Sequence, residues 1–382
     1  MTGPVTPRRI GAFDRLRGLI MVLMAIDHAS FFIARVHPAE SWGYGPPYYA
    51  STTAFLTRWI THLCAPGFFL LMGAGMAMFA ATRRRAGWSR RRVTRFLVTR
   101  GAILLVVQHF VENPAWLLGL LSASPDLGEL APFPGDQSDV YANFAVITAL
   151  GVSMIVWGLL IEVPTGVVVA VSLAAMAASM ILTPGPEHAT DSYSFLMRFL
   201  FVPGQGSFVV VVYSVVPWLV PAGLGVLLAR LVARRPSFIE NRAALVGGLL
   251  IATFIVLRAA RLGDYHAAPP GLIGFLSVTK YPPSLDFFAV MLGIDLVLLA
   301  MLARPVPAWA ANPLQVFGQV PLFFYLLHLY LFGALSWFFR HGTSFGVMYL
   351  VWLAALAGMY PACRWYARFK TAKPITSVWR MF

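Results

Sequence analysis

Residues 13–28 of the chain read Phe13-Asp14-Arg15-Leu16-Arg17-Gly18-Leu19-Ile20-Met21-Val22-Leu23-Met24-Ala25-Ile26-Asp27-His28. This run predicts a membrane-spanning helix that begins with charged residues and carries an Asp-His pair far inside. At a rise of ~1.5 Å per residue, Asp27 and His28 lie about 20 Å along the axis from Asp14. A hydrocarbon core of ~30 Å therefore leaves the pair inside the bilayer, nearer its far side. Ionisable groups at such a depth cost about 2.5–3.5 kcal/mol or more, so we expect the pair to face a bundle interior or a wet cavity.

One face of this helix combines polar and sulfur-containing side chains. With about 3.6 residues per turn, Arg17, Met21, Met24 and His28 point in similar directions. The face is suited to line a passage from one side of the membrane toward the other. The alternative interpretation is a buried hydrogen bond between Asp27 and His28 that only holds helices together.

The composition is that of a multi-pass membrane protein. Of 382 residues, 59% are hydrophobic and 12% are charged, whereas soluble domains carry about 25% charged residues. The net charge of +14 does not indicate nucleic-acid binding, because the cations lie in short loops, where they act as topology signals. Cys64 and Cys363 both fall in apolar segments, which argues against a disulfide framework.

Apolar runs predict an all-α, polytopic transmembrane helix bundle, with residues 1–382 as a single integral-membrane domain. With the N-terminus in the cytoplasm, most of the 29 Lys and Arg residues fall on the inner side, so both termini are predicted to be cytoplasmic. Residues 123–139 are expected to form an acidic, turn-rich outer loop. Pro217 and Pro221 are expected to kink or break their helix, and close helix approach is expected at Gly73, Gly75, Gly223 and Gly225. The ten predicted helices are 13–35, 54–82, 93–121, 140–161, 164–183, 205–233, 242–262, 284–303, 313–339 and 344–367.

Further ionisable residues are predicted in the outer half of the membrane. Arg58 and His62 are four residues apart and share one helix face, and His62 reaches about the depth of Asp27 and His28. A histidine takes and gives protons near neutral pH, which predicts a reactive or proton-handling site in this half. Each residue alone can equally be a structural hydrogen bonder or, like Arg58, an interfacial side chain. The candidates for the acceptor side of the site are Arg58, His109, Lys280, Asp286 and His328.

On the inner side, residues 83–95 form a dense cationic loop. One interpretation is topology plus binding of anionic lipid, worth about 1 kcal/mol per residue. The other is a docking surface for a polyanionic cofactor such as a nucleotide-bearing thioester. No nucleotide-binding glycine motif is present, and no ligand spacing indicates a metal site, so no metal is expected. The candidate phosphate-binding residues are Arg17, Arg84, Arg91 and Arg95.

Several segments resemble the bacterial membrane proteins related to heparan-α-glucosaminide N-acetyltransferase, in the wider transmembrane acyltransferase group. The first is Asp14-Arg15-Leu16-Arg17-Gly18, followed by Met24-Ala25-Ile26-Asp27-His28. The resemblance spans nearly the whole chain. Its remaining segments are 58–66, 73–75, 278–284, 312–314, 321–328 and 360–365.

The resemblance implies a helical bundle of the bacterial inner membrane that takes acetyl groups from cytosolic acetyl-CoA as co-substrate. It implies transfer to an amino or hydroxyl group of an acceptor on the non-cytosolic side, here a cell-envelope glycan or glycolipid. In the animal enzyme the catalytic histidine follows the first helix, and the nearest candidate here is His37, with His28 and His62 as alternatives. Asp27 stands where the animal enzyme has an asparagine. The expected partners are the lipid bilayer, acetyl-CoA and the acceptor, without nucleic acid, and a homo-oligomer is left open.

The leading hypothesis is therefore an acetyl-CoA-dependent membrane acyltransferase in which His28, oriented by Asp27 or a nearby polar group, works with His62 or His37. The first rival is a small-solute or proton-coupled transporter, because mid-membrane His and Asp residues also make proton relays. The second is a non-catalytic scaffold. Pro217 and Pro221 would suit the broken helices of a transporter, but the absence of a repeated pair of such interruptions counts against a transporter.

Overall fold

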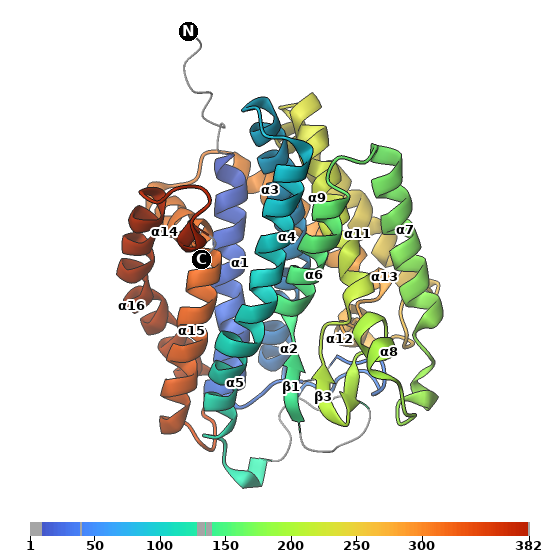
Figure 1. The fold of residues 1–382 in the computed structure, drawn as a ribbon. Coiled ribbons are helices and arrows are strands. Elements are labelled where there is room, and N and C mark those ends of the chain that lie inside the picture. The colour runs from blue at the N-terminus through green and yellow to red at the C-terminus, as the bar shows by residue number, and fades with distance from the viewer. Residues whose placement is uncertain (1–9, 39, 128–133, 135–139, 381–382) are drawn as a thin grey trace.

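The computed structural model describes residues 10–38, 40–127, 134 and 140–380, which form a bundle of long helices (Figure 1). In this part of the chain, eight helical stretches are long and apolar enough to cross a membrane, and two shorter apolar helices accompany them. The prediction of a polytopic helical bundle is confirmed. Most of the acidic 123–139 segment lies outside the described residues.

The long stretches contain short irregular turns. α1 (Gly11–Ala29) continues into a π-helical turn (Ser30–Ala34), and α2 (Thr52–Trp59) joins α3 (Cys64–Arg85) through a 3₁₀ turn (Ile60–Leu63). α4 (Arg90–Val107) joins α5 (Asn113–Leu120) through a second π-helical turn. The other long helices are α6 (Val146–Leu159), α7 (Thr165–Leu182), α9 (Val215–Arg234), α11 (Ala243–Ala259), α13 (Leu285–Ala303), α14 (Ala308–Gln319), α15 (Pro321–Leu335) and α16 (Phe345–Thr371).

A small sheet and three short helices complete the described structure. β1 (Val140–Phe144) pairs in parallel with β3 (Phe208–Val211), and β2 (Gly204–Gly206) pairs antiparallel with β3. All three strands lie at the end of the bundle opposite the start of α1 (Figure 1). The short helices are α8 (Phe195–Leu200), α10 (Phe238–Asn241) and α12 (Gly271–Leu276).

Each of the ten predicted segments overlaps a helix, but three begin or continue differently. The first residues of 140–161 and of 205–233 are strands, because β-branched and aromatic residues such as Val209 and Val210 fit a pleated sheet better than a helix. The 313–339 segment is divided between α14 and α15 at Pro321, which opens α15, where its missing N–H costs nothing. α9 is not broken: Pro217 lies in its first turn and the helix continues past Pro221.

The first turns of α1 and the last turn of α16 lie at the same end of the bundle (Figure 1). The guanidinium of Arg17 donates to the Gly318 carbonyl over 3.0 Å, and the Lys370 ammonium donates to the Gln319 carbonyl over 2.9 Å. The end of α14 therefore joins these two helices. This agrees with the prediction that both termini share one side of the membrane.

Glycines allow α3 and α9 to touch backbone to backbone. A Cβ atom on Gly73 would lie 1.9 Å from the Ala222 carbonyl oxygen, and one on Gly225 would lie 2.0 Å from the Leu70 carbonyl oxygen. Without a hydrophobic driving force between helices in lipid, such close van der Waals contact is a main source of their association. The prediction of close approach is confirmed for these two glycines.

The two other predicted glycines behave differently. The prediction is also confirmed for Gly223, which approaches α7 in place of α3: a Cβ on this residue would lie 2.3 Å from Ser172 Oγ. Gly75 has no atom within 4 Å of that position. The prediction for Gly75 is therefore wrong, because the rotation of α3 turns this residue away from every neighbour.

The matched pair Gly73→Ala and Gly75→Ala tests this packing. Gly73→Ala should destabilise the protein by about 1–3 kcal/mol, because the added methyl group collides with backbone rather than with a movable side chain. Gly75→Ala should be neutral or stabilising by up to ~1 kcal/mol, because alanine is the better helix former. Thermal melts in detergent measure both, and equal melting temperatures would contradict the close approach.

Candidate functional site

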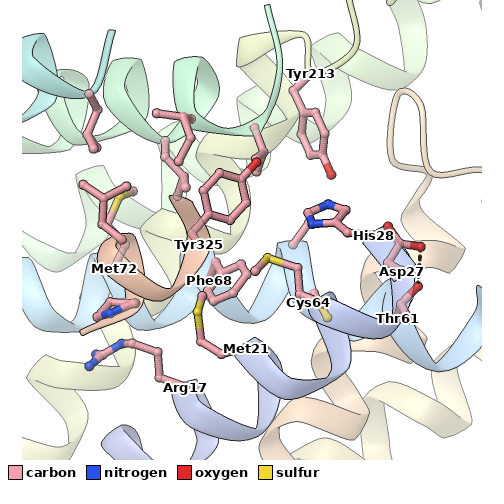
Figure 2. A pocket seen from close by; sticks show the side chains of 18 of the residues that line it. Arg17, Met21, Asp27, His28, Thr61, Cys64, Phe68, Met72, Tyr213 and Tyr325 are labelled. Carbon is pink, nitrogen blue, oxygen red and sulfur yellow. Dashed lines mark hydrogen bonds between the residues drawn. The ribbon is translucent and has the colours of Figure 1, made fainter. Parts of the chain in front are cut away.

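A cavity of about 240 Å³ lies between α1, α3, α4, α6 and α15. The four residues predicted to share one face of the first helix, Arg17, Met21, Met24 and His28, all line it. Figure 2 shows Arg17 toward one end and Asp27 and His28 toward the other. The cavity therefore follows α1 for about 15 Å, given a rise of ~1.5 Å per residue. Its other lining side chains include Thr61, Cys64, Phe68, Met72, Arg100, Met154, Tyr213, Lys280 and Tyr325.

The guanidinium of Arg58 links two buried carboxylates beside this cavity. Its Nη1 lies 2.5 Å from Asp27 Oδ1, while its Nε and Nη2 lie 2.8 and 2.5 Å from the two oxygens of Glu40. The hydroxyl of Thr61 donates to the same Asp27 oxygen over 3.0 Å. The planar guanidinium of Arg58 bonds both oxygens of Glu40 at once, which a lysine ammonium could not do in the same geometry.

The electrostatics of Glu40 depend on this arginine. Burial by itself raises the pKa of the Glu40 carboxyl, but the Arg58 guanidinium and His62 outweigh burial and hold that pKa well below its ordinary value. His62 Nε2 lies 3.4 Å from Glu40 Oε1, and the Tyr49 hydroxyl donates to the same oxygen over 3.3 Å. His62 therefore supports Glu40 and does not line the cavity.

Main-chain pairing brings Lys280 to the same place. The amides of Lys280 and Tyr281 both donate to the Glu40 carbonyl, over 3.1 and 3.0 Å, and the Trp42 amide donates to the Tyr281 carbonyl over 2.8 Å. Lys280 is buried and lines the cavity, with its Nζ 5.1 Å from the centre of the Tyr281 ring. No carboxylate of the described residues lies within 4 Å of this ammonium, so it presents an unpaired positive charge to the Asp27 end of the cavity.

His28 pairs with His328 and not with Asp27. His28 Nδ1 lies 2.6 Å from His328 Nε2, and both rings are buried. Because successive helical residues point about 100° apart, Asp27 turns toward Arg58 and Thr61 while His28 turns toward α15. The sequence-based proposals that Asp27 orients His28, or bonds it structurally, are therefore wrong. His328 lies behind His28 and does not line the cavity, so it does not occupy the expected acceptor-side position.

His37 follows the end of the first helix and approaches Asp27 from the other side. Its Nδ1 lies 3.9 Å from Asp27 Oδ1. Burial, reinforced by the Arg58 guanidinium, lowers the pKa of His37 to about 3, so its ring is neutral at physiological pH. His37 stands behind Asp27 and does not contribute to the cavity wall.

Two predicted outer residues are not brought to the site. His109 is half-buried in the π-helical turn Gln108–Glu112 between α4 and α5, where its Nδ1 lies 3.3 Å from the Asn113 amide nitrogen. Asp286 is buried beside Arg258, with 3.9 Å between Oδ2 and Nη1, and its amide donates to the Gly263 carbonyl. Asp286 therefore ties the loop that follows α11 to the first turn of α13.

At the Asp27 end of the site, sequence reasoning missed Glu40, Tyr213 and Tyr325. Glu40 lies three residues after His37, in the loop that follows the first helix, and a carboxylate in the loop between this helix and the helix of Arg58 was a usable signal. Tyr213 lies between β3 and α9, and nothing in its sequence neighbourhood indicates a site. Tyr325 donates its hydroxyl to Glu112 Oε1 over 2.5 Å and packs near His28, with ring centroids 6.0 Å apart.

A second cavity, of about 330 Å³, lies where α4 begins. Arg100 lines both cavities, and its Nε has no hydrogen-bond partner among the described residues. The guanidinium of Arg92 lies 4.2 Å from the centre of the Trp88 ring. The remaining lining residues are Arg95, Phe96, Thr99, Ile103, Thr376, Ser377 and Val378.

Of the four arginines predicted to bind phosphate, two line a cavity. Arg17 lines the first and Arg95 the second. Arg84 lies outside both and pairs with Glu162, 3.2 Å from Nε to Oε1, and Arg91 is exposed outside both. Arg92 and Arg100 line the cavities where Arg84 and Arg91 were expected. The packing of α4 decides which of its sides faces the cavities, and the sequence alone does not show this.

The family model described as "Heparan-alpha-glucosaminide N-acetyltransferase, catalytic" matches residues 9–253. The chain belongs to this family. It is a membrane protein of an acetyltransferase type, whose matched part holds Arg17, Asp27, His28, Arg58 and Arg100. Lys280 and His328 lie after the matched residues. No curated protein matches the chain.

Removing the guanidinium should destabilise the site strongly. Arg58→Met leaves the Asp27 and Glu40 carboxylates buried without their cation, a type of change that costs about 3–5 kcal/mol. Adding Glu40→Gln to Arg58→Met removes one uncompensated charge and should recover part of the loss. Thermal unfolding of the two single variants and the double variant measures this coupling, and additive effects would contradict a direct dependence of Glu40 on Arg58.

Proposed function

We propose that the protein transfers an acetyl group from cytosolic acetyl-CoA to an amino or hydroxyl group of a glycan or glycolipid on the other side of the membrane. The observation that supports this most is the main cavity, which runs from arginines at one end to Asp27, His28 and Lys280 at the other. This order matches a donor such as acetyl-CoA, whose phosphates would lie by the arginines, whose long thin arm would fill the cavity, and whose thioester would reach the other end. Membership in an N-acetyltransferase family supports the same chemistry.

The donor enters from the end where α4 begins, which the distribution of Lys and Arg assigns to the cytoplasm. Arg92, Arg95 and Arg100 hold the phosphates, because guanidinium groups bond two phosphate oxygens at once. The Trp88 ring offers an aromatic surface for the adenine. Arg100 lines both cavities, so a donor whose phosphates lie there can extend its arm into the first cavity.

The arm of the donor then lies along the methionine-rich wall of the first cavity. Met21, Met24, Met72 and Met154 line it, and their flexible thioethers adapt to an irregular chain. Arg17 stands at the entrance. The thioester reaches the end where His28 and Lys280 face the cavity.

Acetyl transfer at this end requires a base and a stabilised oxyanion. The acceptor nitrogen or oxygen forms a bond to the carbonyl carbon while His28 takes its proton. Negative charge on the carbonyl oxygen is stabilised by the Lys280 ammonium. The carbon–sulfur bond then breaks, and the proton on His28 passes to the departing thiolate, so that CoA leaves as a thiol. An acetyl-histidine relay would use the same groups.

The proposed reaction also requires a defined position of the protein in the membrane. The chain is a single multi-pass domain of the bacterial inner membrane with both termini in the cytoplasm. His28 and Lys280 lie toward the far side of the bilayer, so the acceptor reaches them from the cell envelope. The bilayer, acetyl-CoA and the glycan or glycolipid are then its partners, without a metal cofactor.

Purified protein in proteoliposomes, assayed with acetyl-CoA and glucosamine, tests this function. His28→Asn should lower kcat by ~10²–10⁴ while leaving donor affinity nearly unchanged, because a general base acts in the chemical step. Lys280→Met should lower kcat by ~10²–10³, the usual cost of losing an oxyanion partner. Turnover at the parental rate in both variants would contradict this catalytic centre.

Donor binding is separated from chemistry by a matched arginine series. Arg95→Gln and Arg100→Gln should each weaken CoA binding by about tenfold or more and reduce its dependence on salt, because each loses a charged phosphate contact. Arg91→Gln, on the same helix but outside both cavities, should bind CoA as the parent does. Isothermal titration measures all three, and equal affinities across the series would contradict the second cavity as the phosphate site.

A further inference from the structure

His28 and His328 form a pair of buried imidazoles at the wall of the main cavity. Their hydrogen-bonded nitrogens are 2.6 Å apart, and the rings are nearly parallel, with centroids 4.8 Å apart. His28 lines the cavity, whereas His328 is fully buried on α15. The pair therefore has one member that can meet a substrate and one that cannot.

The main chain fixes the hydrogen positions of this pair. His328 Nδ1 lies 3.0 Å from the Phe324 carbonyl oxygen. A carbonyl oxygen only accepts, so the hydrogen of a neutral His328 is on Nδ1 and its Nε2 carries a lone pair. That lone pair can only accept from His28, so the hydrogen of a neutral His28 is on its own Nδ1. His28 Nε2 is then left unprotonated.

His328 is held in its neutral form by its surroundings. It is packed against the rings of Phe324, Tyr325 and Phe332. No carboxylate in the described ranges lies within 4 Å of it, and an uncompensated charge buried among aromatic rings is costly. The opposite tautomer would place the Nδ1 lone pair against the carbonyl oxygen of Phe324, which is repulsive.

Asp27 is not available to orient His28. Its Oδ1 accepts from Arg58 Nη1 over 2.5 Å and from the Thr61 hydroxyl over 3.0 Å. No bond joins Asp27 to the His28 ring anywhere in the described structure. Orientation of the imidazole therefore comes from α15.

We propose that His328 is a positioning residue that sets the tautomer of His28, so that His28 Nε2 faces the cavity as a proton acceptor. The proposal rests on the acetyl transfer proposed above and assigns the atom that takes the proton. When Nε2 accepts the proton of the attacking amine or hydroxyl group, His28 becomes an imidazolium whose Nδ1–H still donates to His328. The proton returns from Nε2 to the sulfur of the departing CoA, and His328 itself exchanges no proton.

Two substitutions of His328 separate its role in orienting His28 from its role in packing. In His328→Gln the amide oxygen can still accept from His28 Nδ1–H, while His328→Leu fills the space without an acceptor. His328→Leu should lower kcat by ~10-fold to 100-fold with an unchanged KM for acetyl-CoA, as is usual for partners that orient a functional histidine. His328→Gln should recover most of this loss. In a His28→Asn background, His328→Leu should have no further effect on kcat.

The tautomer itself is read by ¹⁵N NMR of protein labelled at histidine, with the His28 signals assigned by their loss in His28→Asn. The parent should show a protonated Nδ1 and an unprotonated Nε2 on His28, and His328→Leu should disturb this pattern while His328→Gln retains it. A hydrogen on Nε2 in the parent, or equal kcat values for the Leu and Gln variants, would overturn the proposal. If the tautomer is as described and no acetyl transfer occurs, the proposed function fails while the assignment of His328 stands.

Discussion

The buried guanidinium of Arg58 connects parts of the chain that have no other reason to meet. It belongs to α2, one of its carboxylate partners is on α1, and the other is in the loop that follows α1. Arg58 and Glu40 are buried, and a buried charge that loses its partner is costly, so each depends on the other. The Glu40 main chain then pairs with Lys280 and Tyr281, which carries the same constraint to the loop before α13. An ion pair that holds the fold thereby also places a lysine at the end of a cavity.

The two ends of the main cavity differ in the charged groups that surround them. At the end where α4 begins, arginines lie around the second cavity and the entrance of the first, where phosphates and water are available. Toward the other end, the Arg58 guanidinium is paired with Asp27 and Glu40, whereas the Lys280 ammonium faces the cavity. Between them lies a mostly apolar wall that includes four methionines and Phe68. Such a gradient suits a ligand that is charged at one end and reactive at the other.

Sequence reasoning predicts what depends on local periodicity and fails where rotation or long-range pairing decides. The face of Arg17, Met21, Met24 and His28 was predicted because helical spacing alone places them together. His109 was assigned to the site by its depth, yet depth does not determine on which side of a helix a residue points. The pairing of Glu40 with Lys280 joins residues far apart in the chain, and no local pattern predicts it. His328 was found as a candidate, but its role depends on the Phe324 carbonyl, which sequence alone does not orient.

The most direct test of the central claim is the structure, by electron cryomicroscopy, of the protein bound to an acetyl-CoA analogue with a methylene group between sulfur and carbonyl. We expect the phosphates among Arg92, Arg95 and Arg100, the arm along the main cavity, and the carbonyl oxygen within hydrogen-bond distance of Lys280 Nζ. The same structure should place the carbonyl carbon near His28 Nε2. An analogue whose carbonyl lies outside the main cavity, or whose arm leaves the cavity empty, would show that acetyl transfer does not take place at His28 and Lys280.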